Sequence, residues 1–294
     1  MISSWDTRGV VMSHVVGCID RSRAAVSVCD YAAWASLRLA APLMLFHVTD
    51  QERYPAPTDL AGNIGLGSRE HLLEELASLD EQRGKLALEH GQHLLQAAEQ
   101  RVREAGVRQV HQRQRHGSLS ESLLAIEADT RLLVIGLHGE SSNDGKLQVG
   151  SQLETVIRSV TRPVMVVPDE FTAPRSAMLA FDGSDTALKG VQVLAASPLL
   201  EGLPLHLVMV GEDSAERQQQ LESARSVLAP LGCELHVAIR EGEVETALHQ
   251  YQAEHHIDLL IMGAYGHSRI RQFLVGSTTT NMLKTATTPL IILR

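Results

Sequence analysis

Short runs that are apolar at every position recur along this chain, separated by stretches with hydrophobic residues at helical spacing. The apolar runs stand at Val11–Asp20, Pro42–Val48, Leu132–Gly136, Val164–Val167, Ser176–Asp182, Pro204–Val210, Leu259–Gly263 and Leu290–Leu293. A strand that is hydrophobic at every position is buried on both faces, as in a parallel sheet whose strands are joined by helical crossovers. The pattern therefore predicts an α/β fold with doubly wound sheets that carry helices on both faces.

The pattern occurs twice, which indicates a duplicated unit. The first apolar run of each half ends at an aspartate, and 28 residues separate Asp20 from Val48 and Asp182 from Val210. Near the end of each half an apolar run closes on glycine, and a proline follows 27 residues later in the first half and 26 later in the second. We therefore expect two tandem modules, residues 10–169 and 176–294, each with a mostly parallel five-stranded sheet.

The first half carries an additional segment. The distance from Asp20 to Gly117 is 97 residues, whereas Asp182 to Gly242 is 60, a surplus of 37. Part of the surplus is a loop rich in proline and glycine, and the rest predicts a helix over Ser68–Gly106. In that helix Ser68 would be the N-cap, with weak points at the two internal glycines. A charged helix resting on its module and a partner-binding arm or lid are both compatible with this segment.

Composition excludes several classes of function. The net charge of −9 and the aromatic content of 3% disfavour non-specific binding to nucleic acid. The N-terminus has no signal-peptide pattern, and no apolar stretch is long enough to span a membrane. Three cysteines form neither a disulfide framework nor a metal-binding spacing. We therefore expect a cytoplasmic protein with reduced thiols, no metal site, and no nucleic-acid or membrane partner.

The most informative motif lies near the end of the second half. Gly263 and Gly266 close a buried strand, and after nine residues Gly276, Ser277 and Thr278 open a predicted helix. Glycine backbone, hydroxyl groups and the free N–H groups of a helix start together form a phosphate cradle. The alternative is that the glycines make turns and the hydroxyls cap the helix. The chain contains no P-loop motif, and Gly62–Gly67 follows no strand, so we interpret it as a loop.

These features resemble the universal stress protein family, whose nucleotide-binding members carry G-x2-G-x9-G-[ST] after the fourth strand and an aspartate after the first. The second half matches both elements, and the first half is a looser copy in which Gly136-x2-Gly139 is followed by ten residues and then Gly150-Ser151. The resemblance covers nearly the whole chain as two tandem modules. It implies that their last strands, Val164–Val167 and Leu290–Leu293, pair in an internal pseudo-dimer.

The resemblance also implies a set of ligand contacts for an adenine nucleotide. Asp182 would accept a hydrogen bond from the adenine side, the backbone at Val210 would frame the base, and the glycine motif would hold ribose and phosphates. The residues of the second module are Asp182, Val210, Gly263, Gly266, Gly276, Ser277 and Thr278, and their first-module equivalents are Asp20, Val48, Gly136, Gly139, Gly150 and Ser151. Both aspartates have an alternative role, because an aspartate before a serine also supports a helix start.

We expect the first module to bind the nucleotide more weakly. Its glycine spacer is one residue longer, Gln152 stands where Thr278 stands in the second module, and Glu140 and Asp144 would repel a polyphosphate. Lys146 would offset part of that repulsion.

Catalytic motifs are scarce. The chain has fourteen histidines but no H-E-x-x-H motif, and it has no G-x-S-x-G nucleophile elbow. We interpret His47 as a satisfied core residue, whereas His267 is either a solvated loop residue or a neighbour of the phosphates. We therefore assign no catalytic residue.

The sequence thus favours a stress-response sensor or regulator that binds ATP, ADP or AMP, with or without Mg²⁺. The alternatives are a nucleotide-free interaction or scaffold protein and a slow ATPase. The sequence leaves open which nucleotide binds and whether the chain also forms a homodimer.

Overall fold

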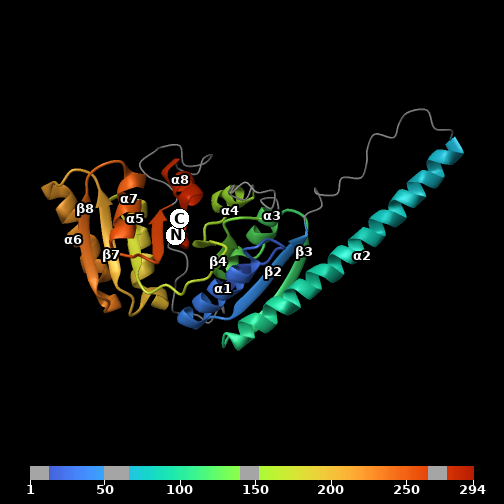
Figure 1. The fold of residues 1–294 in the computed structure, drawn as a ribbon, viewed down its shortest axis with the longest axis horizontal. Helices are drawn as coiled ribbons and strands as arrows, with labels where there is room; N and C mark the ends of the chain where they lie inside the picture. Colours follow the sequence, from blue (N-terminus) through green and yellow to red (C-terminus); the bar gives the residue numbers. More distant parts are fainter. Residues whose placement is uncertain (1–12, 50–65, 140–151, 264–276) are drawn as a thin grey trace.

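The computed structural model describes residues 13–49, 66–139, 152–263 and 277–294 (Figure 1). Two similar units follow one another along the chain. The first contains β1 (His14–Cys18), α1 (Ala25–Leu39), β2 (Leu43–Thr49), α2 (Leu66–Glu104), β3 (Val110–His116), α3 (Leu119–Leu124), β4 (Thr130–Gly136), α4 (Leu153–Ser159) and β5 (Val164–Val167). The second contains β6 (Ala177–Ala180), α5 (Asp185–Ala195), β7 (Leu205–Val210), α6 (Ala215–Leu228), β8 (Leu235–Arg240), α7 (Val244–Glu254), β9 (Leu259–Gly263), α8 (Ser277–Thr285) and β10 (Leu290–Leu293).

All ten of these strands form one sheet, in the order β3-β2-β1-β4-β5-β10-β9-β6-β7-β8. Neighbouring strands are parallel within each unit. β5 and β10 pair antiparallel, with Met165 opposite Ile291. The expected pairing of the last strands is therefore confirmed, and it removes two hydrophobic edges that would otherwise be open to intermolecular pairing.

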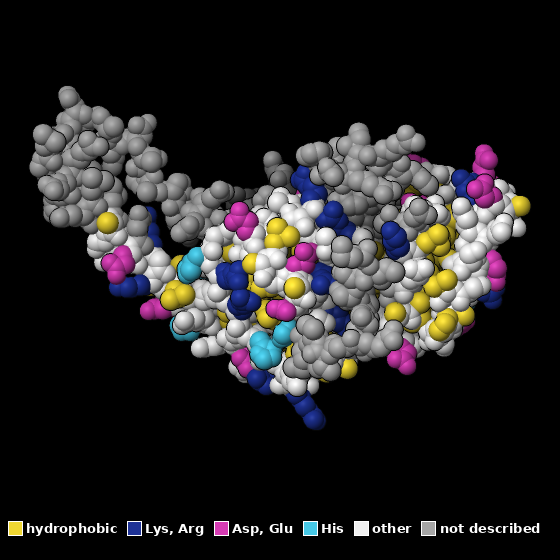
Figure 2. Space-filling model, turned by 180° about the vertical axis from the view of Figure 1, so that it is seen from behind, with side chains coloured by type: hydrophobic (Ala, Val, Ile, Leu, Met, Phe, Trp, Pro, Cys, Tyr) yellow, Lys and Arg dark blue, Asp and Glu magenta, His cyan; other side chains and the backbone are white. Residues whose placement is uncertain are grey.

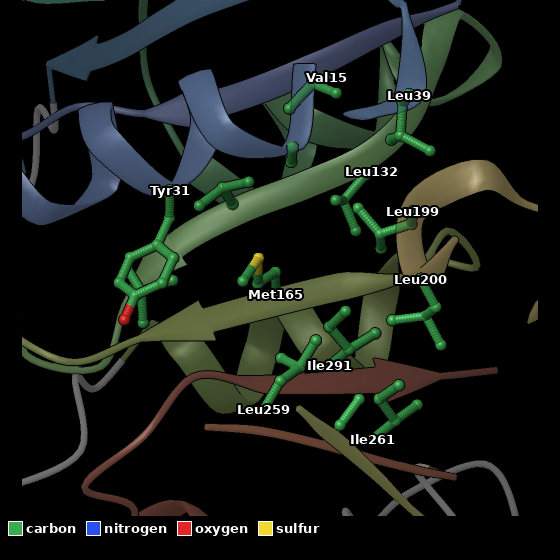
Figure 3. Close-up of a cluster of buried hydrophobic side chains, with 14 of the residues drawn as sticks. Val15, Tyr31, Leu39, Leu132, Met165, Leu199, Leu200, Leu259, Ile261 and Ile291 are labelled. Atoms are coloured by element: carbon green, nitrogen blue, oxygen red, sulfur yellow. The ribbon is translucent and has the colours of Figure 1, made fainter. Parts of the chain in front are cut away.

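Helices cover both faces of the sheet, as the apolar runs predict. One face packs against α1, α2, α5 and α6, and the other packs against α3, α4, α7 and α8. The first of these cores continues across the junction of the two units, where Met165 and Ile291 lie close to Leu199 and Leu200 (Figure 3). The two units therefore share one continuous hydrophobic layer.

Polar contacts reinforce this junction. The Arg38 guanidinium donates from Nε to the Leu199 carbonyl oxygen at 2.5 Å and also bonds the Glu201 carbonyl. From the other side, Arg294 Nη1 donates to the carbonyl oxygens of Ile157 at 3.0 Å and Val160 at 2.8 Å. Each arginine reaches from one unit into the backbone of the other, so the two halves are joined by more than their linker.

The bounds of two helices follow from local sequence and packing. The helix expected to begin after Ser68 begins at Leu66, and it runs without a break through both glycines. Gly91 is required by close packing, because a Cβ there would lie 2.8 Å from the Cδ2 atom of His47 on β2. In the second unit α5 ends at Ala195, because Pro198 cannot donate to a continuing helix and opens a separate 3₁₀ turn.

Candidate functional site

The carboxyl ends of the strands provide the natural ligand edge in both units. In the second unit β6 and β9 are parallel neighbours, but β6 leads to α5 on one face and β9 leads to α8 on the other. β1 and β4 have the same relation in the first unit. Connections that leave two adjacent strands in opposite directions open a crevice at the carboxyl edge, which is where open α/β sheets bind ligands.

Three of the residues expected in the second site lie at this edge. Asp182 follows β6 by two residues, Val210 ends β7, and Gly263 ends β9. The Asp182 side chain is exposed, whereas Val210 and Gly263 are half-buried. The structure therefore brings the ends of three neighbouring strands together, as the parallel sheet requires.

The start of α8 lies against the same edge. Thr279, in the first turn of that helix, donates from Oγ1 to the Gly263 carbonyl oxygen at 3.5 Å and is itself buried. The contact joins the N-terminus of α8 to the end of β9, so the positive end of the helix dipole lies beside the strand ends. Ser277 begins α8, and Thr278 is half-buried there. Gly266, Gly276 and His267 lie outside the described residues.

Thr279 is a residue that the sequence reasoning missed. The sequence motif places the hydroxyl role at Ser277 and Thr278, whereas in the structure the Thr279 hydroxyl contacts the Gly263 carbonyl oxygen. The signal that could have found it is its position three and four residues before the buried Met282 and Leu283, which places all three on one face of α8.

The first unit assembles part of the equivalent arrangement. A Cβ on Gly139 would lie 3.8 Å from Asp20 Oδ2, so that carboxylate is next to the backbone after β4. At Gly136 a Cβ would lie 2.7 Å from the Cβ of Ala24, so glycine there lets the residue before α1 approach the strand end. Val48 is half-buried near the end of β2. Gly150, Ser151, Glu140, Asp144 and Lys146 lie outside the described residues.

The two aspartates differ in their hydrogen bonds. Asp20 Oδ1 accepts from both the backbone N of Ser22, at 3.0 Å, and its Oγ, at 2.5 Å. Asp182 Oδ1 accepts from the backbone N of Ser184 at 3.0 Å, but the Ser184 hydroxyl instead accepts from Ala187 N and caps α5. The helix-start role expected as an alternative is therefore real. It leaves acceptor capacity on the carboxylate, which has about four lone-pair sites.

One histidine considered from the sequence, His47, serves the core. His47 is buried and its Nδ1 lies 2.7 Å from the Ile19 carbonyl oxygen, which confirms its interpretation as a satisfied core residue. Within the described ranges, no group of three or more His, Cys, Asp or Glu side chains is arranged to hold a metal ion. In the same part of the chain, no helix is both long enough and apolar enough to cross a membrane.

A histidine cluster in the second unit was not foreseen. His206 is buried on β7, its Nδ1 lies 2.9 Å from the Tyr251 hydroxyl, and its ring stacks on His236 of β8 at a centroid distance of 4.5 Å. The ring centroid of His255 lies 5.2 Å from that of His206. Burial, followed by the charges of these two histidines, lowers the pKa of His206 to about 4. The cluster depends on cross-strand register, which spacing along the sequence does not reveal.

Comparison with known proteins gives consistent results. The sequence model of the universal stress protein family matches residues 12–168 and 211–294. Universal stress protein Slr1230 of Synechocystis sp. PCC 6803 is 34% identical over 287 residues, which cover 96% of this chain and 100% of that protein. The crystal structure of a universal stress protein from Archaeoglobus fulgidus superimposes with a TM-score of 0.70 at 19% identity, over 96% of this chain and 98% of its own. A universal stress protein solved in complex with cAMP matches 42% of this chain and 98% of its own, at 26% identity and a TM-score of 0.35.

Proposed function

Because this chain belongs to the universal stress protein family, we propose that it binds an adenine nucleotide, ATP or a close relative, chiefly in the second module. The observation that carries the proposal is the meeting of Asp182, Val210 and Gly263 with the first turn of α8 at one switch point of the sheet. That edge presents a carboxylate acceptor, the backbone of two strand ends and a helix N-terminus.

Each of these groups suits a different part of the ligand. The exposed Asp182 carboxylate accepts from the base side, and the backbone after Val210 borders the base. The N-terminus of α8 carries partial positive charge and N–H donors, which hold phosphate without requiring a lysine or arginine. The net charge of −9 therefore does not oppose binding of a small anion at this edge.

We further propose that the two modules bind unequally. In the first module both donors of Ser22 occupy Asp20, whereas in the second module the Ser184 hydroxyl caps a helix. The neighbouring serine therefore donates two hydrogen bonds to Asp20 but only one to Asp182, so fewer donors compete with the ligand at Asp182. Loss of a charge-assisted hydrogen bond to a ligand costs about 1.5–3 kcal/mol, or roughly a tenfold to hundredfold loss of affinity.

The role we propose for this site is stress-linked regulation rather than turnover. The sequence carries no nucleophile or zinc-hydrolase motif, so bound nucleotide would act by favouring one conformation or assembly over another. Such an effect requires that the two states differ in their affinity for the nucleotide.

Calorimetric titration with ATP, ADP and AMP, with and without Mg²⁺, tests the proposal. We expect Asp182→Ala to weaken nucleotide binding at least about tenfold, and the matched Asp20→Ala to change it little. Inorganic triphosphate should bind equally to wild type and Asp182→Ala, because the carboxylate contacts the base side.

Two outcomes would contradict the assignment. Equal losses from the two substitutions would refute the inequality, and no heat with any nucleotide would favour a nucleotide-free interaction protein. Product analysis after prolonged incubation with ATP and Mg²⁺ separates a binding protein from a slow ATPase.

A further inference from the structure

Helix α2 consists of two parts with different surroundings. In the part after residue 90, the buried positions Gly91, Leu95, Ala98 and Val102 repeat at spacings of four and three and face the module. Arg101 fixes this part to α1 through two bonds to the Asp30 carboxylate, at 2.7 and 2.8 Å. The part before residue 91 extends away from the module, and we call residues 66–90 the arm (Figure 1).

The arm exposes hydrophobic side chains. Leu79 is 48% exposed and Leu86 is 65% exposed, and Figure 2 shows the arm standing clear of the body. At 1.5 Å per residue, the arm is about 37 Å long. A single helix of this kind is marginally stable in water unless an apolar face is packed. The exposed leucines of the arm therefore call for a packing partner beyond the module.

The leucines of the arm follow a coiled-coil repeat. Leu72, Leu79 and Leu86 are spaced by seven residues, and Leu76 precedes Leu79 by three. Leu86 lies about 140° around the helix from Gly91, so this seam is not a continuation of the face that packs on the module. Leu88 lies about 180° from Leu79 and does not belong to the seam. A heptad seam of this length suits another helix.

The charges of the arm identify its partner as a second arm. Residues 69–81 contain five acidic residues and one basic residue, whereas residues 82–88 contain two basic residues and no acidic residue. Two arms that run antiparallel and cross near Leu79 place the acidic segment of each beside the basic segment of the other. Parallel arms would place like charges together, which is unfavourable.

We propose that two copies of this chain associate through their arms as an antiparallel helical pair related by a two-fold axis near Leu79. Such an axis makes the contact self-complementary and closed. In this arrangement residue 91 of one copy lies near residue 67 of the other, so the two bodies stand at opposite ends of the paired helices. The proposal uses surfaces separate from the nucleotide edge and stands independently of the proposed function.

Sedimentation velocity of the full chain over a range of concentrations tests the association. We expect the wild type to shift from monomer to dimer, and Leu79→Glu to raise the dissociation constant at least about tenfold. Leu88→Glu, on the opposite side of the same helix, should change it less than about twofold. Circular dichroism confirms that each variant remains folded.

Charge reversal tests the direction of the pair. Glu75→Arg and Arg83→Glu should each weaken self-association, because each brings like charges together across the axis. An equimolar mixture of the two variants should associate as well as the wild type. A wild type that stays monomeric at all concentrations would overturn the proposal, even if the arm bound another protein. A dimer that is indifferent to Leu79→Glu, or a mixture that does not recover, would overturn it as well.

Discussion

His206 should make the stability of the second module depend on pH. Its pKa is lowered to about 4 from an ordinary value of 6.5, first by burial and then by His236 and His255, with Glu234 acting in the opposite direction. In the unfolded chain the same side chain takes up a proton near its ordinary pKa. Between these two values the unfolded state binds more protons than the folded state. The free energy of unfolding therefore decreases as the pH falls from about 6.5 to about 4.

The size of the loss in stability follows from the interval between the folded and unfolded pKa values of His206. One proton bound only by the unfolded state changes the free energy of unfolding by at most about 1.4 kcal/mol per pH unit, so a fully shielded group would lose about 3 kcal/mol across this range. His236 and His255 are exposed, so solvent screens the cluster. We therefore expect a smaller loss, about 1–2 kcal/mol.

The first module supplies the substitution for this test. Met44 holds the place on β2 that His206 holds on β7 and is also buried, so His206→Met introduces a side chain that this fold already accepts there. To avoid leaving the Tyr251 hydroxyl without its partner, Tyr251→Phe is made in both proteins. Urea unfolding of Tyr251→Phe and of the double variant, followed from about pH 7 to about pH 4.5, then isolates the histidine.

As the pH falls, the free energy of unfolding of the double variant should decrease by about 1–2 kcal/mol less than that of Tyr251→Phe. Other titrating groups are common to both proteins and cancel in the difference. Parallel loss of stability in the two proteins would refute the reasoning, because His206 would then bind its proton equally well in the folded and unfolded states.

Three further predictions concern packing, thiols and the junction. Gly91→Val should reduce the free energy of unfolding by about 1–3 kcal/mol, because its side chain meets β2 and β3. Gly84→Ala should raise the free energy of unfolding by about 0.5–1 kcal/mol, because no atom lies within 4 Å of the new Cβ. Urea unfolding in which Gly84→Ala is less stable than Gly91→Val would contradict the observed packing. A thiol reagent should label half-buried Cys233 before Cys29, whose pKa is raised to about 12 by burial; equal rates would contradict this. Arg294→Ala should lower the free energy of unfolding by about 1 kcal/mol, seen as a lower urea midpoint, because Arg294 follows β10 and donates hydrogen bonds to the backbone around α4.

Most of the sheet was predictable because the strands inside it are buried on both faces, whereas the edge strands β3 and β8 are partly exposed. Runs such as Leu259–Gly263 are apolar at every position, and their order fixes a parallel sheet with crossovers. The pairing of β5 with β10 followed from the resemblance to a family rather than from hydrophobicity, since any apolar edge can pair. For the candidate site, the sequence located the strand-end positions Asp182, Val210 and Gly263, because glycine and aspartate punctuate strand ends.

What the sequence left open depends on contacts between distant segments. The charges of α2 are compatible with a helix resting on its module and with an arm, and the structure divides the helix between them, because the buried positions among its described residues begin only at Gly91 and residues 66–90 extend beyond the module (Figure 1). The stack of His206 on His236 arises from the register of β7 against β8. Neither residue has a neighbour in sequence that would reveal the other.

The antiparallel contact of β5 and β10 has a consequence for how the protein responds to its own abundance. Separate subunits that share a sheet in this way come apart on dilution, and their pairing follows mass action. Here a linker of only nine residues, 168–176, joins the end of β5 to the start of β6. It keeps the two units at a high effective concentration. The joined sheet therefore persists at any expression level.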